Sequence, residues 1–188
     1  MLLLVPFLLG LLIGIGTGGK VGNLASLRFR WPWFVLAVLV VREAILFRPF
    51  DRIDGVQFIY AAALAGLVAW TAWHIRRLPG VWVACAGATM NLVVVLANGA
   101  RMPVTPELAG PLVREGHLAQ YVLMGPGTNL NWLADWIVFP WPVRGAYSPG
   151  DLVIAVGIGV VVLLGTIHEP NAGTKLDETS ARIGDYPP

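Results

Sequence analysis

Residues 91–107 read NLVVVLANGARMPVTPE, and within this stretch a long apolar segment gives way to a polar one. Asn91 and Asn98 are seven residues apart, so on a helix they would share one face, two turns from each other. Arg101 follows three residues later, beyond Gly99, where we expect the helix to have ended. The apolar part is typical of a helix inside a membrane, and the polar part is typical of chain that has left it.

The composition excludes a water-soluble globular domain. The chain has 188 residues, of which 56% are hydrophobic and 13% charged, and its mean hydropathy is +0.70. Soluble domains carry about 25% charged residues. The net charge of +2 comes from lysines and arginines scattered in ones and twos, which gives no reason to expect a nucleic-acid partner. The single cysteine, Cys85, lies inside an apolar segment and is interpreted as a small buried hydrophobic residue.

Apolar segments separated by polar turns predict an all-α integral membrane protein with five transmembrane helices. The last of these helices should begin at Ser148, which is placed to cap it, with Pro149 in the first turn and Asp151 reaching back to the cap amide. We expect residues 1–168 to form the membrane domain and the polar residues 169–188 to form a tail that cannot fold alone. The expected spans are residues 2–15, 31–47, 56–73, 81–97 and 152–167.

Residues 98–148, between the fourth and fifth spans, should form an amphipathic interfacial segment. Thr105, Pro106 and Glu107 predict the start of one short helix. Residues 128–139 predict a second, because apolar side chains and polar side chains fall on opposite sides of a helical projection. The tryptophans in and after this segment suit the depth of a membrane–water interface.

Small residues at spacings of four indicate where helices pack closely together. In the first span Gly10, Gly14 and Gly18 predict a groove along one side. In the third span Ala61, Ala65 and Ala69 predict a similar packing stripe, with Ala62 and Gly66 beside it.

The distribution of positive charge predicts the orientation. The first span has no basic residue before it, and Lys20, Arg28 and Arg30 follow it. Because basic residues favour the cytoplasmic side, we expect the N-terminus and residues 98–148 outside and the C-terminus in the cytoplasm.

Four short motifs resemble a bacterial family of small multi-pass membrane proteins classed as a domain of unknown function. They are LPGVW at residues 78–82, NGARMPV at 98–104, LADWI at 133–137 and SPGD at 148–151. The resemblance covers most of the chain up to about His168. It implies a location in the bacterial cytoplasmic membrane and brings no activity with it.

The strongest candidate site is a set of polar residues near the outer face: Asn91, Asn98, Arg101, Asp135 and Asp151. Polar residues at membrane depth are functional candidates by default, and Arg101 could hold a carboxylate, a phosphate or a lipid headgroup. The alternative is structural, in which Asn98 caps the helix end and Arg101 pairs with an acid that anchors the loop.

No cofactor and no metal site is predicted. His74 and His168 end the third and fifth spans on the same expected side, where two imidazoles could hold a haem or a pigment. The helix dipole already explains a histidine at each of these positions.

Three classes of function remain open at this level. The first choice is a non-catalytic accessory or scaffolding subunit of a larger membrane complex, in contact with membrane lipids and with other membrane-protein subunits. The alternative is a small transporter or lipid-handling protein with a polar pocket around Asn98 and Arg101. An enzyme is disfavoured because the chain has no H-E-x-x-H or G-x-S-x-G motif, although Glu115, His117 or Asp135 could take part in catalysis.

Overall fold

The protein is mostly helical. The computed structural model describes residues 2–27, 29–45, 55–107, 109, 120–139 and 145–168, without the side chains at positions 42 and 43. The expected tail, residues 169–188, and the candidate residues Glu115 and His117 lie outside the described residues. The helices of the described part are α1 (Leu4–Gly16), α2 (Val21–Leu24), α3 (Pro32–Ile45), α4 (Val56–His74), α5 (Val81–Ala97) and α7 (Pro149–Ile167).

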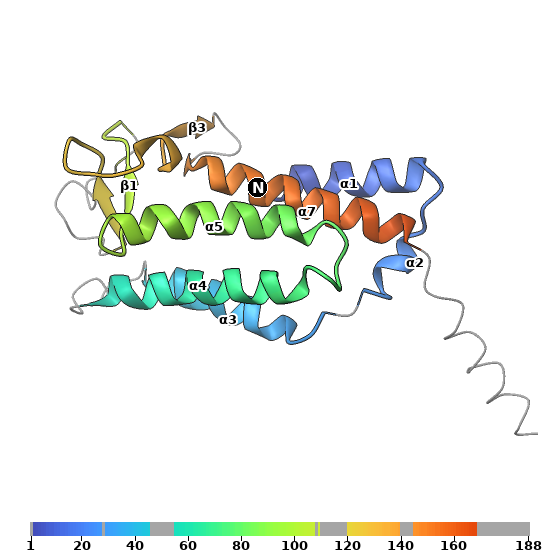
Figure 1. The fold of residues 1–188 in the computed structure, drawn as a ribbon. Helices are drawn as coiled ribbons and strands as arrows, with labels where there is room; N and C mark the ends of the chain where they lie inside the picture. Colours follow the sequence, from blue (N-terminus) through green and yellow to red (C-terminus); the bar gives the residue numbers. More distant parts are fainter. Residues whose placement is uncertain are drawn as a thin grey trace, which may run out of the picture.

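The helices lie side by side and alternate in direction along the chain, with α7 packed between two neighbours (Figure 1). α5 lies antiparallel to α7 on one side of α7, and α1 lies on the other side of α7. α4 packs against α5, and α3 packs against α4. One end of this bundle carries α2 and the turn between α4 and α5, while the other end carries the strands.

Glycines bring α1, α5 and α7 into close contact. A Cβ added at Gly10 would overlap the backbone of Gly159, and one added at Gly14 would overlap the side chain of Thr166. On the other side of α7, Gly157 lies directly against Ala84 of α5. The predicted groove is therefore confirmed at Gly10 and Gly14, and α7 fills it. The prediction was wrong for Gly18, which lies beyond the end of α1 with a left-handed φ of +94°.

The predicted packing stripe on α4 is divided between two environments. Ala61 is buried and Gly66 contacts the ring of Phe34 in α3, whereas Ala62, Ala65 and Ala69 are exposed.

The segment between α5 and α7 contains strands, so the expectation of an all-α protein was wrong there. β1 (Met102–Val104) pairs in parallel with β2 (Tyr121–Leu123), and β3 (Ile137–Phe139) pairs antiparallel with β4 (Gly145–Tyr147). A short 3₁₀ helix, η2 (Asn131–Leu133), lies between the two pairs. These strands and η2 are called the cap below.

The helix predicted over residues 128–139 was also wrong. Leu130 has a left-handed φ of +54° and Ala134 is extended, so no continuous helix passes through them. The backbone N–H of Asp135 donates to the carbonyl of Pro103 in β1 instead of to a carbonyl four residues earlier. Pairing with a distant strand has replaced the local helical bonds. Of the helix expected from Thr105, the described residues show a turn at 106–107, and residues 108 and 110–119 lie outside the described part.

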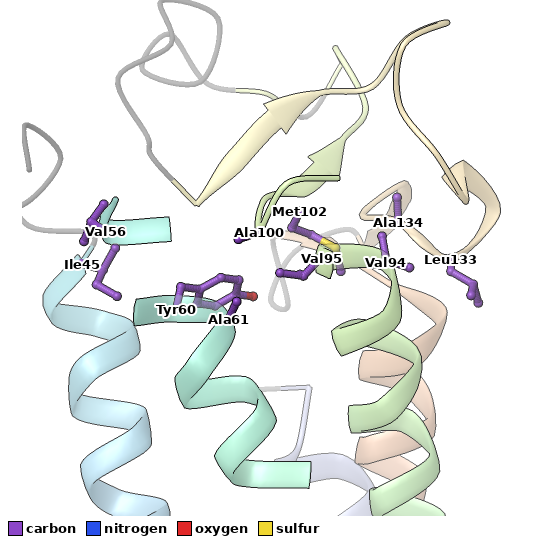
Figure 2. Packing of buried hydrophobic residues seen from close by; sticks show 10 residues of the cluster. All are labelled: Ile45, Val56, Tyr60, Ala61, Val94, Val95, Ala100, Met102, Leu133 and Ala134. Carbon is purple, nitrogen blue, oxygen red and sulfur yellow. The ribbon is translucent and has the colours of Figure 1, made fainter. Parts of the chain in front are cut away.

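The cap and the neighbouring helix ends share one apolar core (Figure 2). In β1, Met102 and Val104 are 3% and 4% exposed, so the strand is buried. The ends of α3, α4 and α5 supply most of the remaining side chains. The ten buried residues of this core are Ile45, Val56, Tyr60, Ala61, Val94, Val95, Ala100, Met102, Leu133 and Ala134.

Two of the helices, α4 and α7, are long and apolar enough to cross a membrane, with 19 residues each. Only 22% of the α4 apolar window and 39% of the α7 window is buried inside the protein. α1, α5 and residues Pro32–Val41 of α3 are apolar but shorter. Large apolar side chains are exposed along α1 and α3, which agrees with a location in lipid.

Candidate functional site

The predicted polar cluster does not form a single site. In the described part of the chain its five residues occupy three places: the junction of α5 with α7, the end of α5, and the neighbourhood of β1.

Asn91 joins α5 to the start of α7. Its Nδ2 donates to Asp151 Oδ1 at 2.8 Å, and its Oδ1 accepts from the hydroxyl of Ser148 at 2.7 Å. Ser148 and Asp151 form the predicted capping box, in which Asp151 N donates to Ser148 Oγ and Ser148 N donates to Asp151 Oδ2. Asn91 and Ser148 are buried, so these bonds hold the two helices together with little competition from water.

Two glycines make this junction possible. A Cβ at Gly150 would overlap the side-chain oxygen of Asn91, and one at Gly87 would lie 2.5 Å from the carbonyl of Gly150. The asparagine can reach the cap of α7 only because both helices carry glycine where they cross. We call Asn91, Ser148 and Asp151 the helix junction.

Asn98 fastens the end of α5 to the loop that follows. Its Nδ2 donates to the carbonyls of Val94 and Asn129, and its Oδ1 accepts from Asn129 N at 2.7 Å. The side chain of Asn129 donates in return to the carbonyl of Ala97. The structural interpretation of Asn98 as a cap at the helix end is confirmed by its bond to Val94.

Asp135 and Arg101 both lie next to β1, but Asp135 is buried and Arg101 is exposed. Asp135 is 5% exposed, and its backbone bonds to Pro103 and Thr105 form a parallel bridge beside β1. Arg101 is exposed and precedes β1, directly after Gly99 and Ala100, which both have left-handed φ. These two left-handed residues turn the chain back over the end of α5. The hypothesis of a transporter or lipid-handling pocket stays a prediction, and Arg101 is the residue on which to test it.

His74 is completely buried at the end of α4, and both of its ring nitrogens are engaged. Nδ1 lies 2.8 Å from the carbonyl of Trp70, and Nε2 accepts from the backbone N–H of Arg30 at 3.2 Å. A cofactor metal at His74 would have to replace one of these bonds. His168 is exposed as the C-cap of α7. Among the described residues no three His, Cys, Asp or Glu side chains are grouped as metal ligands require.

The sequence reasoning missed three contacts that involve polar side chains. Asn129 meets Asn98 across 31 residues, and Asn23 donates to the carbonyl of Thr166 across 143. Trp70 donates from its indole N–H to the carbonyl of Arg30. Nothing in the local sequence around these residues signals partners so far away.

The arrangement is suited to holding structure together. The side-chain amides of Asn91 and Asn98 form their hydrogen bonds with other parts of the chain. A buried amide without such partners would destabilise the protein. Asn91 therefore ties α5 to α7, and Asn98 ties the end of α5 to the loop at Asn129.

No curated protein and no solved structure matches the chain. The family model of DUF5317, described as a family of unknown function, matches residues 26–163, which include α3 to α5, the cap and most of α7. The chain belongs to the DUF5317 family.

Proposed function

We propose that this protein is a non-catalytic, multi-pass protein of the bacterial cytoplasmic membrane that acts as an accessory or scaffolding subunit of a larger membrane complex. In this proposal α1, α3, α4, α5 and α7 each cross the membrane. The N-terminus and the cap lie outside, and the C-terminus lies in the cytoplasm.

The alternating directions of the helices support five crossings, because successive helices can then enter and leave the bilayer in turn (Figure 1). At 1.5 Å per residue, the 13 residues of α1 span about 20 Å, which is less than the roughly 30 Å of a hydrocarbon core. Local thinning of the bilayer and flanking side chains that reach the interface can accommodate short helices.

The observation that carries the proposal is the outer face of α4. Ala62, Ala65, Ala69 and Ala72 are exposed in a row at spacings of three and four, while the opposite face of α4 packs against α5 and α3. In lipid, small residues allow a second helix to approach closely and gain van der Waals contact. Gly10 and Gly14 of α1 and the glycines of α7 already pack inside the protein, whereas this alanine face is left for another subunit.

The polar residues agree with a non-catalytic role. Asn91 and Asn98 are engaged in the helix junction and in the contact with Asn129. Holding helices and cap in place is what a scaffold requires of such side chains.

The test compares leucine substitutions on two exposed helix faces. Ala65→Leu would place a larger side chain in the middle of the α4 face, and Ala86→Leu would do the same on the exposed side of α5. Wild-type protein isolated in mild detergent should carry another membrane subunit in fixed stoichiometry, as measured by native mass spectrometry. We expect Ala65→Leu to lose that subunit and Ala86→Leu to keep it. A wild-type protein that is isolated with lipid alone, or an Ala65→Leu variant that keeps its partner, would contradict the proposal.

A further inference from the structure

Two arginines and three tryptophans gather where α3 begins and α4 ends. The guanidinium carbons of Arg30 and Arg77 lie 5.6 and 4.9 Å from the centroid of the same indole, that of Trp73. Trp31 contacts Trp73 edge-on at 6.2 Å and stacks on Trp33 at 5.6 Å. We call these five residues the Trp73 patch.

Hydrogen bonds to side chains of α4 hold the backbone of Arg30 in place. The N–H of Arg30 donates to His74 Nε2, and the carbonyl of Arg30 accepts from the indole N–H of Trp70. Trp31 has a φ of +58°, a conformation that a bulky residue adopts only when its surroundings impose it. The segment that carries Arg30 and Trp31 is therefore held against the last turn of α4.

Few acidic residues lie near the positively charged patch in the sequence. Residues 1–42 and 55–106 contain no aspartate or glutamate, and these two ranges include α1, α2, α4, α5 and the start of α3. Stacking on an indole occupies the face of a guanidinium and leaves its N–H edge free to bind an anion. Both guanidinium groups lie within about 6 Å of one indole, and arginine binds a phosphate through two parallel hydrogen bonds, so this pair of arginines is a favourable place for a phosphate group.

The surroundings of the patch favour a lipid over a free phosphate. Trp31, Trp33 and Trp73 are 54%, 60% and 46% exposed, and exposed indoles at helix ends are typical of the headgroup region of a membrane. From Trp33 an exposed apolar row continues along α3 through Leu36 and Val40, where an acyl chain could lie. A free phosphate would make no use of this row.

We infer that the Trp73 patch binds the phosphate of an anionic phospholipid, with Arg30 and Arg77 on the headgroup and the α3 row beside an acyl chain. This inference rests on the proposed membrane location of the protein. It does not depend on a partner subunit.

The experiment measures binding of phosphatidylglycerol and of phosphatidylcholine with matched acyl chains to the full-length protein, by native mass spectrometry in detergent. Replacing both arginines, in Arg30→Gln/Arg77→Gln, should weaken binding of phosphatidylglycerol by about tenfold or more, because each basic residue near a headgroup contributes several-fold to affinity. Binding of phosphatidylcholine should stay within about twofold of wild type, since its net charge is zero. The variant Arg30→Lys/Arg77→Lys keeps the charge and should fall between wild type and the glutamine variant, because lysine lacks the planar fork.

The matched control is Lys20→Gln/Arg76→Gln, which removes the same charge from exposed residues at the same end of the bundle. If this control loses as much affinity as Arg30→Gln/Arg77→Gln, the attraction is general and the inference is overturned. It is also overturned if wild type does not prefer phosphatidylglycerol, or if millimolar inorganic phosphate at constant ionic strength displaces the lipid. A thermal midpoint that matches wild type establishes that each variant is folded. Because the measurement uses the isolated protein, its result is separate from the partner-loss experiment on Ala65.

Discussion

At the scale of single residues, side-chain amides hold separate parts of this protein together. Asn91 bonds to the hydroxyl and the carboxylate of the helix junction, and Asn98 bonds to the loop at Asn129. An amide is suited to both tasks because it has donors and acceptors on one short side chain. A charged residue in the place of Asn91 would face a large desolvation cost between two helices.

Asn91→Ala should lower the free energy of unfolding by about 1–3 kcal/mol, because Ser148 Oγ and Asp151 Oδ1 would each lose a partner in a buried place. Denaturant or thermal unfolding in detergent measures the change. The matched control on the same helix is Thr89→Ala, since Thr89 is exposed and bonds only to the carbonyl of Cys85 in its own helix. Equal stability of the two variants would mean that the helix junction contributes nothing.

At the scale of the elements, close packing of α1, α5 and α7 depends on the absence of side chains. Pro6 and Gly10 of α1 both approach Gly159, and Gly87 and Ala84 of α5 approach α7 from the other side. Helices that have no water-driven attraction in lipid gain their stability from such short distances.

Gly159→Ala should separate α1 from α7. The new Cβ would lie 2.7 Å from the carbonyl oxygen of Pro6, so the helices must shift, at a cost of about 1–3 kcal/mol in the free energy of unfolding. Gly16→Ala is the control, because a Cβ at Gly16 would have no neighbour within 4 Å. Alanine is also the better helix former, so that variant should be neutral or more stable by up to about 1 kcal/mol. If Gly159→Ala and Gly16→Ala destabilise the protein equally, close packing of α1 against α7 does not explain the effect.

At the scale of the whole molecule, the two ends of the bundle differ in chemistry. The cap end carries strands, the capping box of α7 and the aspartates Asp135 and Asp151. The other end carries the Trp73 patch, Lys20 and Arg76. This asymmetry agrees with the proposed orientation, in which the second end faces the cytoplasm.

Single cysteines test that orientation. In a background that carries Cys85→Ala, Arg101→Cys should react in intact cells with a maleimide that cannot cross the cytoplasmic membrane. Lys20→Cys, at the opposite end, should react only after the membrane is permeabilised. Both native residues are exposed, so accessibility within the protein does not confuse the comparison. Reaction of the two cysteines from the same side would contradict an odd number of crossings between them and the proposed placement of the cap.

The helices and their ends can be predicted from the sequence most closely where neighbouring residues decide them. Ser148, Pro149 and Asp151 lie within four residues of one another, so the capping box could be predicted and is confirmed. Gly10 and Gly14 lie on one helix, so their groove could be predicted as well, although the sequence could not say that α7 would fill it. Gly80, the N-cap of α5, directly follows Pro79 in the turn between α4 and α5 and has a left-handed φ of +79°.

The contacts of the polar residues and the fold of the cap depend on long-range packing, which the sequence pattern does not reveal. Residues 128–139 have a helical pattern of apolar side chains, yet the backbone of Asp135 bonds to a segment thirty or more positions earlier. Its N–H donates to the carbonyl of Pro103 in β1, and its carbonyl accepts from the N–H of Thr105. Asn98 and Asn129, or Arg30 and His74, likewise meet only because the helices bring them together. Local propensities are worth fractions of a kcal/mol per residue, and the burial of β1 outweighs them.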